Sequence, residues 1–134
     1  MRLQQGALKH NLMAFFLVIV GLAVLVTTML PPSYNADLSL IGKDKPAIVI
    51  VYDSGNLSSI QLVENMNPIK QQLSESVHFL LADVNSPDGR AFQRKVGVHD
   101  GTALFYSPTG EKLFELNGPR ETDVLQSIIE QTFN

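Results

Sequence analysis

The side chains that could take part in chemistry lie in two short stretches of the sequence. Ser58 and Ser59 could act as nucleophiles only beside a base that takes up the proton, and none of the three histidines lies near them in the sequence. Ser58 instead precedes an apolar helical pattern, with Gln61 three residues later as a partner for a capping box. We therefore expect Ser58 to be the N-cap of a helix rather than a catalytic group.

The second stretch contains His99 and Asp100, which could bind a metal ion together with Asp53. Imidazole and carboxylate groups are metal ligands, but these three residues lack the spacing of a diagnostic ligand set. The sequence also contains no cysteine, which removes thiolate metal sites, disulfides and sulfur nucleophiles. We expect no metal ion and no cofactor, and we interpret the three side chains as polar loop residues.

The charge of the chain argues against nucleic acid as a partner. From Ser33 onward, the sequence carries eight Lys and Arg residues against all 13 acidic residues, a net charge of −5. Binding to phosphates needs clustered positive charge. The nearest approach to a cluster is Arg90, Arg94 and Lys95, whose spacing is typical of the solvated face of a helix.

Residues 12–30 form an apolar run without a charged side chain. Nineteen residues of helix span roughly 28 Å, which is close to the thickness of the hydrocarbon core of a bilayer, so we expect a transmembrane helix. The run is longer than the apolar part of a cleaved signal peptide, and no small-x-small site follows it, which favours an uncleaved signal anchor. Because Arg2 and Lys9 precede the run, residues 1–11 would be a short cytoplasmic N-terminus, and the C-terminal domain would be periplasmic, on a bacterial inner membrane.

The rest of the sequence alternates strand and helix patterns. Residues 31–44, which begin with two prolines, are expected to be an extended spacer before a domain over residues 45–134. Residues 47–52 are a β-branched apolar run typical of a strand buried on both faces. The later patterns predict a helix over 58–73, a strand over 77–84, a short helix over 89–95, a hairpin of strands 102–106 and 112–116, and a final helix over 122–133.

This order of elements resembles the thioredoxin fold, and several local phrases add to the resemblance. They are Lys45-Pro46, residues 82–87, Val96-Gly97-Val98, residues 102–106, residues 109–111 and Gly118. The resemblance implies an α/β protein with a thioredoxin-like fold, in which a central mixed sheet is flanked by helices over residues 45–134. One N-terminal transmembrane helix would precede this domain.

The sequence departs from the family's pattern where thioredoxins carry out thiol chemistry. Two registers place the family's Cys-x-x-Cys motif on residues 56–59 or on residues 60–63, and neither range contains cysteine. Ile50 stands where many members have a buried carboxylate, and Gly101 replaces the family's cis-proline. Thiol–disulfide oxidoreductase activity is therefore excluded, because both steps of that reaction need a thiolate.

A retained fold without this chemistry favours a binding role. In the family, the backbone just before the cis-proline pairs with an extended substrate segment, and Gly101 would leave this backbone accessible. The expected partner-binding edge consists of Tyr52, Asp53, Leu57, Ser58, Val98, His99, Asp100, Gly101 and Thr102. We expect a membrane-anchored, redox-inactive protein-binding or assembly module whose partner is another membrane or periplasmic protein. The alternatives are an enzyme or enzyme subunit with metal or cofactor chemistry in the same cleft, and a purely structural subunit of a membrane complex.

Overall fold

The structure, a computed structural model, describes residues 10–20 and 34–134. The chain divides into two compact units, Met1–Pro31 and Pro32–Asn134. In the first unit, residues 10–20 are helical and exposed. No helix among the described residues is both long and apolar enough to cross a membrane. The predicted transmembrane segment is described only over residues 12–20, and its remainder lies outside the described residues.

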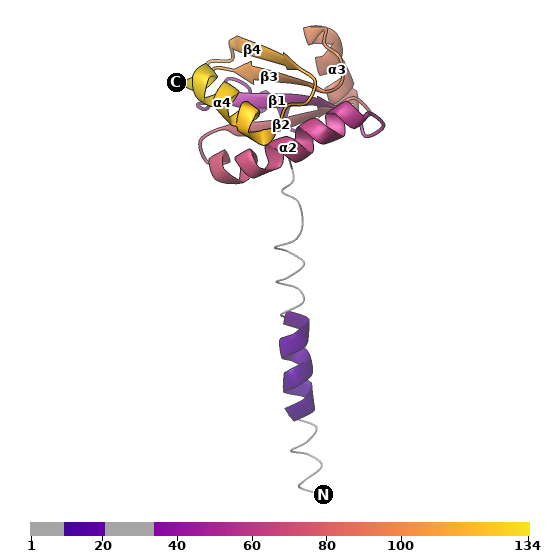
Figure 1. The fold of residues 1–134 in the computed structure, drawn as a ribbon. Coiled ribbons are helices and arrows are strands. Elements are labelled where there is room, and N and C mark those ends of the chain that lie inside the picture. Colours follow the sequence, from indigo (N-terminus) through magenta and orange to yellow (C-terminus); the bar gives the residue numbers. More distant parts are fainter. Residues whose placement is uncertain (1–9, 21–33) are drawn as a thin grey trace, which may run out of the picture. The chain divides into compact units, whose positions relative to one another are not determined.

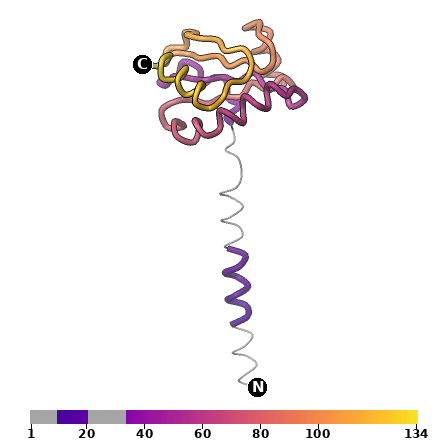
Figure 2. The backbone as a smooth tube through the Cα atoms, viewed as in Figure 1, coloured from indigo at the N-terminus to yellow at the C-terminus, as the bar shows by residue number. Residues whose placement is uncertain are grey.

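Four strands of the second unit form one mixed sheet in the order β2-β1-β3-β4 (Figure 1). The central strand β1 (Ala47–Tyr52) pairs in parallel with β2 (His78–Asp83) and antiparallel with β3 (Thr102–Tyr106), which pairs antiparallel with β4 (Lys112–Asn117). The first five residues of β1 are buried, as the apolar run predicts. Figure 2 traces the same path of the backbone, in which β1 lies between β2 and β3 although it precedes both in the sequence.

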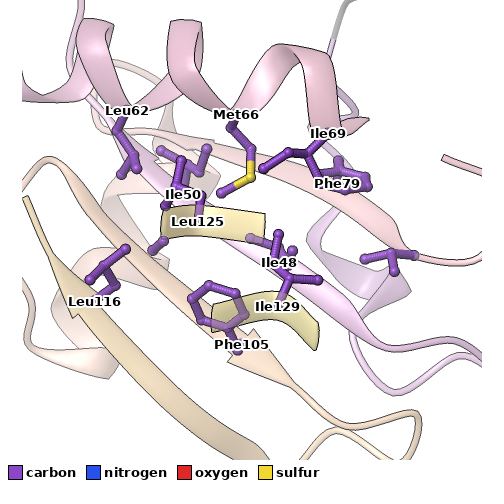
Figure 3. Packing of buried hydrophobic residues seen from close by; sticks show 12 residues of the cluster. Ile48, Ile50, Leu62, Met66, Ile69, Phe79, Phe105, Leu116, Leu125 and Ile129 are labelled. Carbon is purple, nitrogen blue, oxygen red and sulfur yellow. The ribbon is translucent and has the colours of Figure 1, made fainter. Parts of the chain in front are cut away.

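Two helices, α2 (Leu57–Leu73) and α4 (Thr122–Phe133), cover one face of the sheet. In Figure 3, Leu62, Met66 and Ile69 of α2 point toward the strands, and α4 contributes apolar side chains from the same side. The buried members of this main cluster are Ile48, Ile50, Leu62, Met66, Ile69, Val77, Phe79, Ala103, Phe105, Leu116, Leu125 and Ile129. The periodic apolar positions of both helices are thus removed from water, which is the largest source of stability in such a domain.

The opposite face is covered by α3 (Pro87–Val96) and by the segment before β1. That segment contains a short 3-10 helix, η1 (Leu38–Leu40), which packs together with α3 against a second cluster. The buried members of this second cluster are Ala47, Val49, Val51, Leu80, Ala82, Leu104 and Tyr106. The sheet is therefore covered on both sides, but by much less helix on this side.

Residues 34–44 differ from the extended spacer that the sequence predicts. The N–H of Asn35 donates to the carbonyl of Phe79 at 3.3 Å, and the carbonyl of Asn35 accepts from the N–H of Leu81 at 2.9 Å. These bonds add a parallel bridge at the outer edge of β2. Tyr34 packs against the main cluster and η1 against the second, so burial of apolar side chains draws this segment into the folded unit.

The other elements lie within two residues of their predicted ranges. β2 is one residue shorter at each end than the predicted strand 77–84. α3 starts at Pro87 rather than at residue 89, because Ser86 caps it: the Ser86 hydroxyl accepts from the N–H of Gly89 at 3.1 Å, and proline fits the first helical position.

Candidate functional site

The predicted edge lies where β1 ends and α2 begins, and Asn56 rather than Ser58 is the N-cap of α2. The Asn56 backbone is still extended, with φ −114° and ψ 117°, and its Oδ1 accepts from the N–H of Ser58 at 2.8 Å and of Ser59 at 3.4 Å. The predicted Ser58 cap is therefore wrong. Asparagine caps helices as well as serine does, and Asn56 stands where the backbone changes from extended to helical.

Ser59 fixes the loop that precedes the helix. Its side chain is fully buried, and its hydroxyl accepts from the N–H of Asp53 at 3.2 Å. The Asp53 carboxylate accepts in turn from the N–H of Gly55 at 3.0 Å and from the side-chain amide of Asn85 at 3.4 Å. A buried hydroxyl requires such a partner, so Ser59 positions the loop. Sequence reasoning had considered it only as a nucleophile.

The loop before β3 packs directly against the start of α2. A Cβ atom on Gly101 would lie 3.1 Å from Ser58 Cβ and 3.4 Å from the backbone nitrogen of Ser59. Gly101 also has a left-handed backbone, with φ +80°. Glycine meets both conditions because it has no Cβ atom. The structure thus brings together the two loops that hold the predicted edge.

The backbone of Gly101 is not accessible, in contrast to the expectation from the sequence. Its N–H donates to the carbonyl of Val51 at 2.8 Å, and its carbonyl accepts from the N–H of Gly118 at 2.9 Å. Both bonds extend the pairing of β3 with its two neighbours. An extended peptide could not pair with this N–H without displacing the carbonyl of Val51, so a partner cannot add a strand at this residue. The next residue, Thr102, is also buried, and its hydroxyl donates to Asn117 Oδ1 at 3.0 Å.

Gln93 of α3 holds the same loop from its other side. Its side-chain amide donates to the carbonyl of Val98 at 3.2 Å and to the carboxylate of Asp100 at 2.8 Å. Sequence reasoning missed Gln93, because no local pattern distinguishes it from the other polar residues of α3. The loop conformation therefore depends on a contact that only the tertiary structure creates.

The exposed surface of the edge is small and mixed in character. Leu57 is 67% exposed, which makes it the most exposed of the large apolar side chains in residues 34–134. His99 is exposed, whereas Tyr52, Asp53, Ser58, Val98 and Asp100 are half-buried. Tyr52 packs against the main cluster and Val98 against the second, so the edge spans both faces of the sheet.

The three residues considered as metal ligands do not form a ligand set. Across residues 10–20 and 34–134, no three or more His, Asp or Glu side chains lie close enough together to hold a metal ion. The polar contacts of Asp53 and Asp100 go instead to neighbouring loop and helix residues. These contacts agree with the interpretation of the two carboxylates as loop-forming groups.

Comparison with known proteins identifies the fold. No family model and no curated protein matches the chain. A thioredoxin of Malassezia sympodialis matches with a TM-score of 0.59 at 18% identity, over 70% of this chain and 82% of that chain. Thioredoxin O2 from Arabidopsis thaliana, in the oxidized state, matches with a TM-score of 0.59 at 17% identity, over 72% of this chain and 85% of that chain. The chain therefore has a thioredoxin-like α/β fold, built on a mixed sheet flanked by helices.

Proposed function

We propose that this chain is a membrane-anchored, redox-inactive thioredoxin-like module that binds another protein through the edge around Leu57. The observation that carries the proposal is the exposure of Leu57, 67%, at the first residue of α2. When a partner covers an exposed leucine, apolar surface is removed from water, and this lowers the free energy of the complex. The loops around Leu57 are held by Asn56 and Ser59, so a partner would meet a preorganised surface.

The absence of cysteine supports binding over redox chemistry at this edge. Neither register of the family's motif, residues 56–59 or 60–63, contains a thiol, and the hydroxyl of Ser59 is engaged with the backbone of Asp53. At Gly101 itself, binding would use side chains rather than added backbone pairing, because its N–H is already bonded within the sheet.

The membrane anchor is proposed from the sequence of residues 12–30. The run is uncharged and long enough for a bilayer, and Arg2 and Lys9 precede it, which favours a periplasmic C-terminal domain on a bacterial inner membrane. Protease added to intact spheroplasts should then degrade the C-terminal domain. Protection of the domain until the membrane is dissolved would contradict this orientation.

The binding edge can be tested by photo-crosslinking in intact membranes. A photoreactive amino acid at Leu57 or His99, both exposed, should capture the same protein, whereas one at the exposed Gln126 of α4 should not. The captured protein is then identified and its affinity for the purified full chain is measured. Leu57→Asp should weaken binding at least tenfold, and Val124→Asp, which alters another exposed apolar residue of the folded unit, should not. Equal capture from Gln126, or equal losses in the two variants, would overturn the proposal.

Two other functions remain less well supported. A metal-dependent enzyme lacks a converging set of ligands in the described residues. A purely structural subunit would depend on the anchor itself, so exchanging residues 12–30 for an unrelated spanning helix would abolish its function. Under our proposal, the exchanged chain still binds its partner.

A further inference from the structure

A groove of about 710 Å³ lies on the face of the sheet opposite α2 and α4. One wall is α3, and the other is the segment from Ala36 to Ile41, with Tyr106 and Gly110 also contributing. Phe92 and Val96 of α3 are only partly buried here. The groove thus combines these apolar side chains with the charged residues Asp37, Asp88 and Lys95, and none of its lining residues belongs to the edge around Leu57.

The groove exists because little helix covers this face. The main cluster is covered by helices of 17 and 12 residues, whereas the second is covered by the 10-residue α3 and the three-residue η1. A sheet face normally packs against a full layer of secondary structure. The groove beside α3 is therefore left open within the described residues, and the residues of α3 indicate what could bind there.

The groove side of α3 carries charges of both signs at its two ends. Its lining residues are Asp88, Ala91, Phe92, Lys95 and Val96, whose spacing puts them on one face of the helix. Asp88 and Lys95 are seven residues apart, which corresponds to about 10.5 Å along the helix axis. The salt bridge found in the described part of the chain joins Lys112 and Glu115, so neither Asp88 nor Lys95 is paired there.

This face is complementary to itself when two copies of α3 run antiparallel. With a twofold axis midway between Ala91 and Phe92, Asp88 of one copy faces Lys95 of the second copy, and the same pair repeats on the other side of the axis. The small Ala91 then faces the large Phe92, so the surfaces can interdigitate. A parallel arrangement would instead place Asp88 beside Asp88 and Lys95 beside Lys95.

We propose that a second copy of this chain occupies the groove, and that the two copies form a symmetric dimer through antiparallel packing of α3. Each α3 lies in the groove of the other copy, where it covers the half-buried Phe92 and Val96. One pair of short helices buries less surface than a standard interface, so the dimer is weak between chains free in solution. Tethering both copies to one membrane raises their effective concentration and favours the dimer.

The absence of native cysteine permits a direct test with the full chain in its membrane. Ala91→Cys places a single thiol on an exposed residue next to the proposed axis, and Gln126→Cys places one on α4 as the matched control. Mild oxidation should convert Ala91→Cys into a disulfide-linked dimer at least five times faster than Gln126→Cys. Equal rates for the two variants would overturn the proposal.

Charge reversal tests the register of the dimer. In the Ala91→Cys chain, Asp88→Lys or Lys95→Asp alone would bring like charges together, and each should slow crosslinking at least fivefold. The double variant restores both pairs and should restore the rate. Its charges oppose the helix dipole at both ends of α3, so recovery could not come from a more stable helix.

Circular dichroism of each variant establishes that the domain is folded. Failure of the double variant to recover, although folded, would contradict the antiparallel pairing of Asp88 with Lys95. Partner binding at Leu57 is measured in the same variants and should not change, which separates this proposal from the binding function.

Discussion

The two faces of the sheet are formed by the same strands but differ in what covers them. On one face, α2 and α4 enclose the main cluster, in which twelve side chains are buried. On the other, α3 and η1 leave a groove with half-buried apolar side chains and three charged residues, Asp37, Asp88 and Lys95, that form no salt bridge within the described residues. The first face is therefore the more completely enclosed, and the second face and the edge around Leu57 are the surfaces that we propose for association.

Matched leucine substitutions should show the largest difference between the two faces. Leu62→Ala removes a fully buried side chain beneath α2 and should lower the free energy of unfolding by about 3 kcal/mol, because it leaves a cavity. Leu38→Ala on η1 removes a half-buried side chain at the rim of the groove, where the segment can relax, and should cost about 1 kcal/mol. Urea unfolding of the full chain in a non-ionic detergent, followed by circular dichroism, measures both. Similar losses would show that the second face is packed as closely as the first.

Gly89→Ala should have the next largest effect. Alanine normally stabilises a helix relative to glycine, but a Cβ atom at Gly89 would lie 1.9 Å from the carbonyl oxygen of Asp83 at the end of β2. α3 would have to move away from the sheet, at a cost of about 2 kcal/mol. Gly55→Ala is the control, since its Cβ atom would lie 3.6 Å from the Oδ1 atom of Asp53, an ordinary van der Waals contact; a change within about 0.5 kcal/mol is expected there. A stabilised Gly89→Ala chain would mean that α3 is not held at this contact.

The strands and helices themselves could be predicted because their signals are local. The apolar run of β1, the hairpin and the spacing of α4 each lie within a short window of sequence, and the predicted ranges agree with the structure to within two residues. The position of residues 34–41 could not be predicted in this way. Asn35 pairs with Phe79 and Leu81, more than forty residues away, and no short window contains both partners.

The candidate edge was predictable in position but not in its bonding. Ser58 and Gly101 were assigned to neighbouring loops, and the structure places them in contact. Two hydrogen bonds that fix the loop before β3 come from residues outside the predicted edge. The N–H of Gly118 donates to the carbonyl of Gly101, and the side-chain amide of Gln93 donates to the carboxylate of Asp100. Such long-range partners are set by how the helices and strands pack together, and no local pattern in a single sequence indicates this packing.

The cap of α2 offers a smaller test of how the edge is held. Asn56→Ala removes the acceptor for two backbone N–H groups and should lower the free energy of unfolding by about 1 kcal/mol. Ser58→Ala should have little effect, because the structure assigns the cap to Asn56. The same urea titrations measure both, and a larger loss for Ser58→Ala would restore the assignment made from the sequence.

Alkaline pH should show the contribution of Tyr34, where the N-terminal segment crosses to the α2 side of the sheet. Burial raises the pKa of Tyr34 above its ordinary value of 10.0, so the folded chain keeps the phenol proton while the unfolded chain begins to lose it. The unfolded state then binds fewer protons, and stability falls as the pH rises past this value.

Between pH 8.5 and 10.5, this effect should remove about 0.8 kcal/mol of unfolding free energy from the native chain. Tyr34→Phe keeps the aromatic ring that lies 5.2 Å from the Lys70 ammonium but has no proton to lose, so its stability should fall less over the same range. The difference between the two slopes isolates Tyr34 from every other group that titrates. Identical slopes would mean that Tyr34 is solvated in the folded chain, and that the segment before β1 is not anchored on the α2 side.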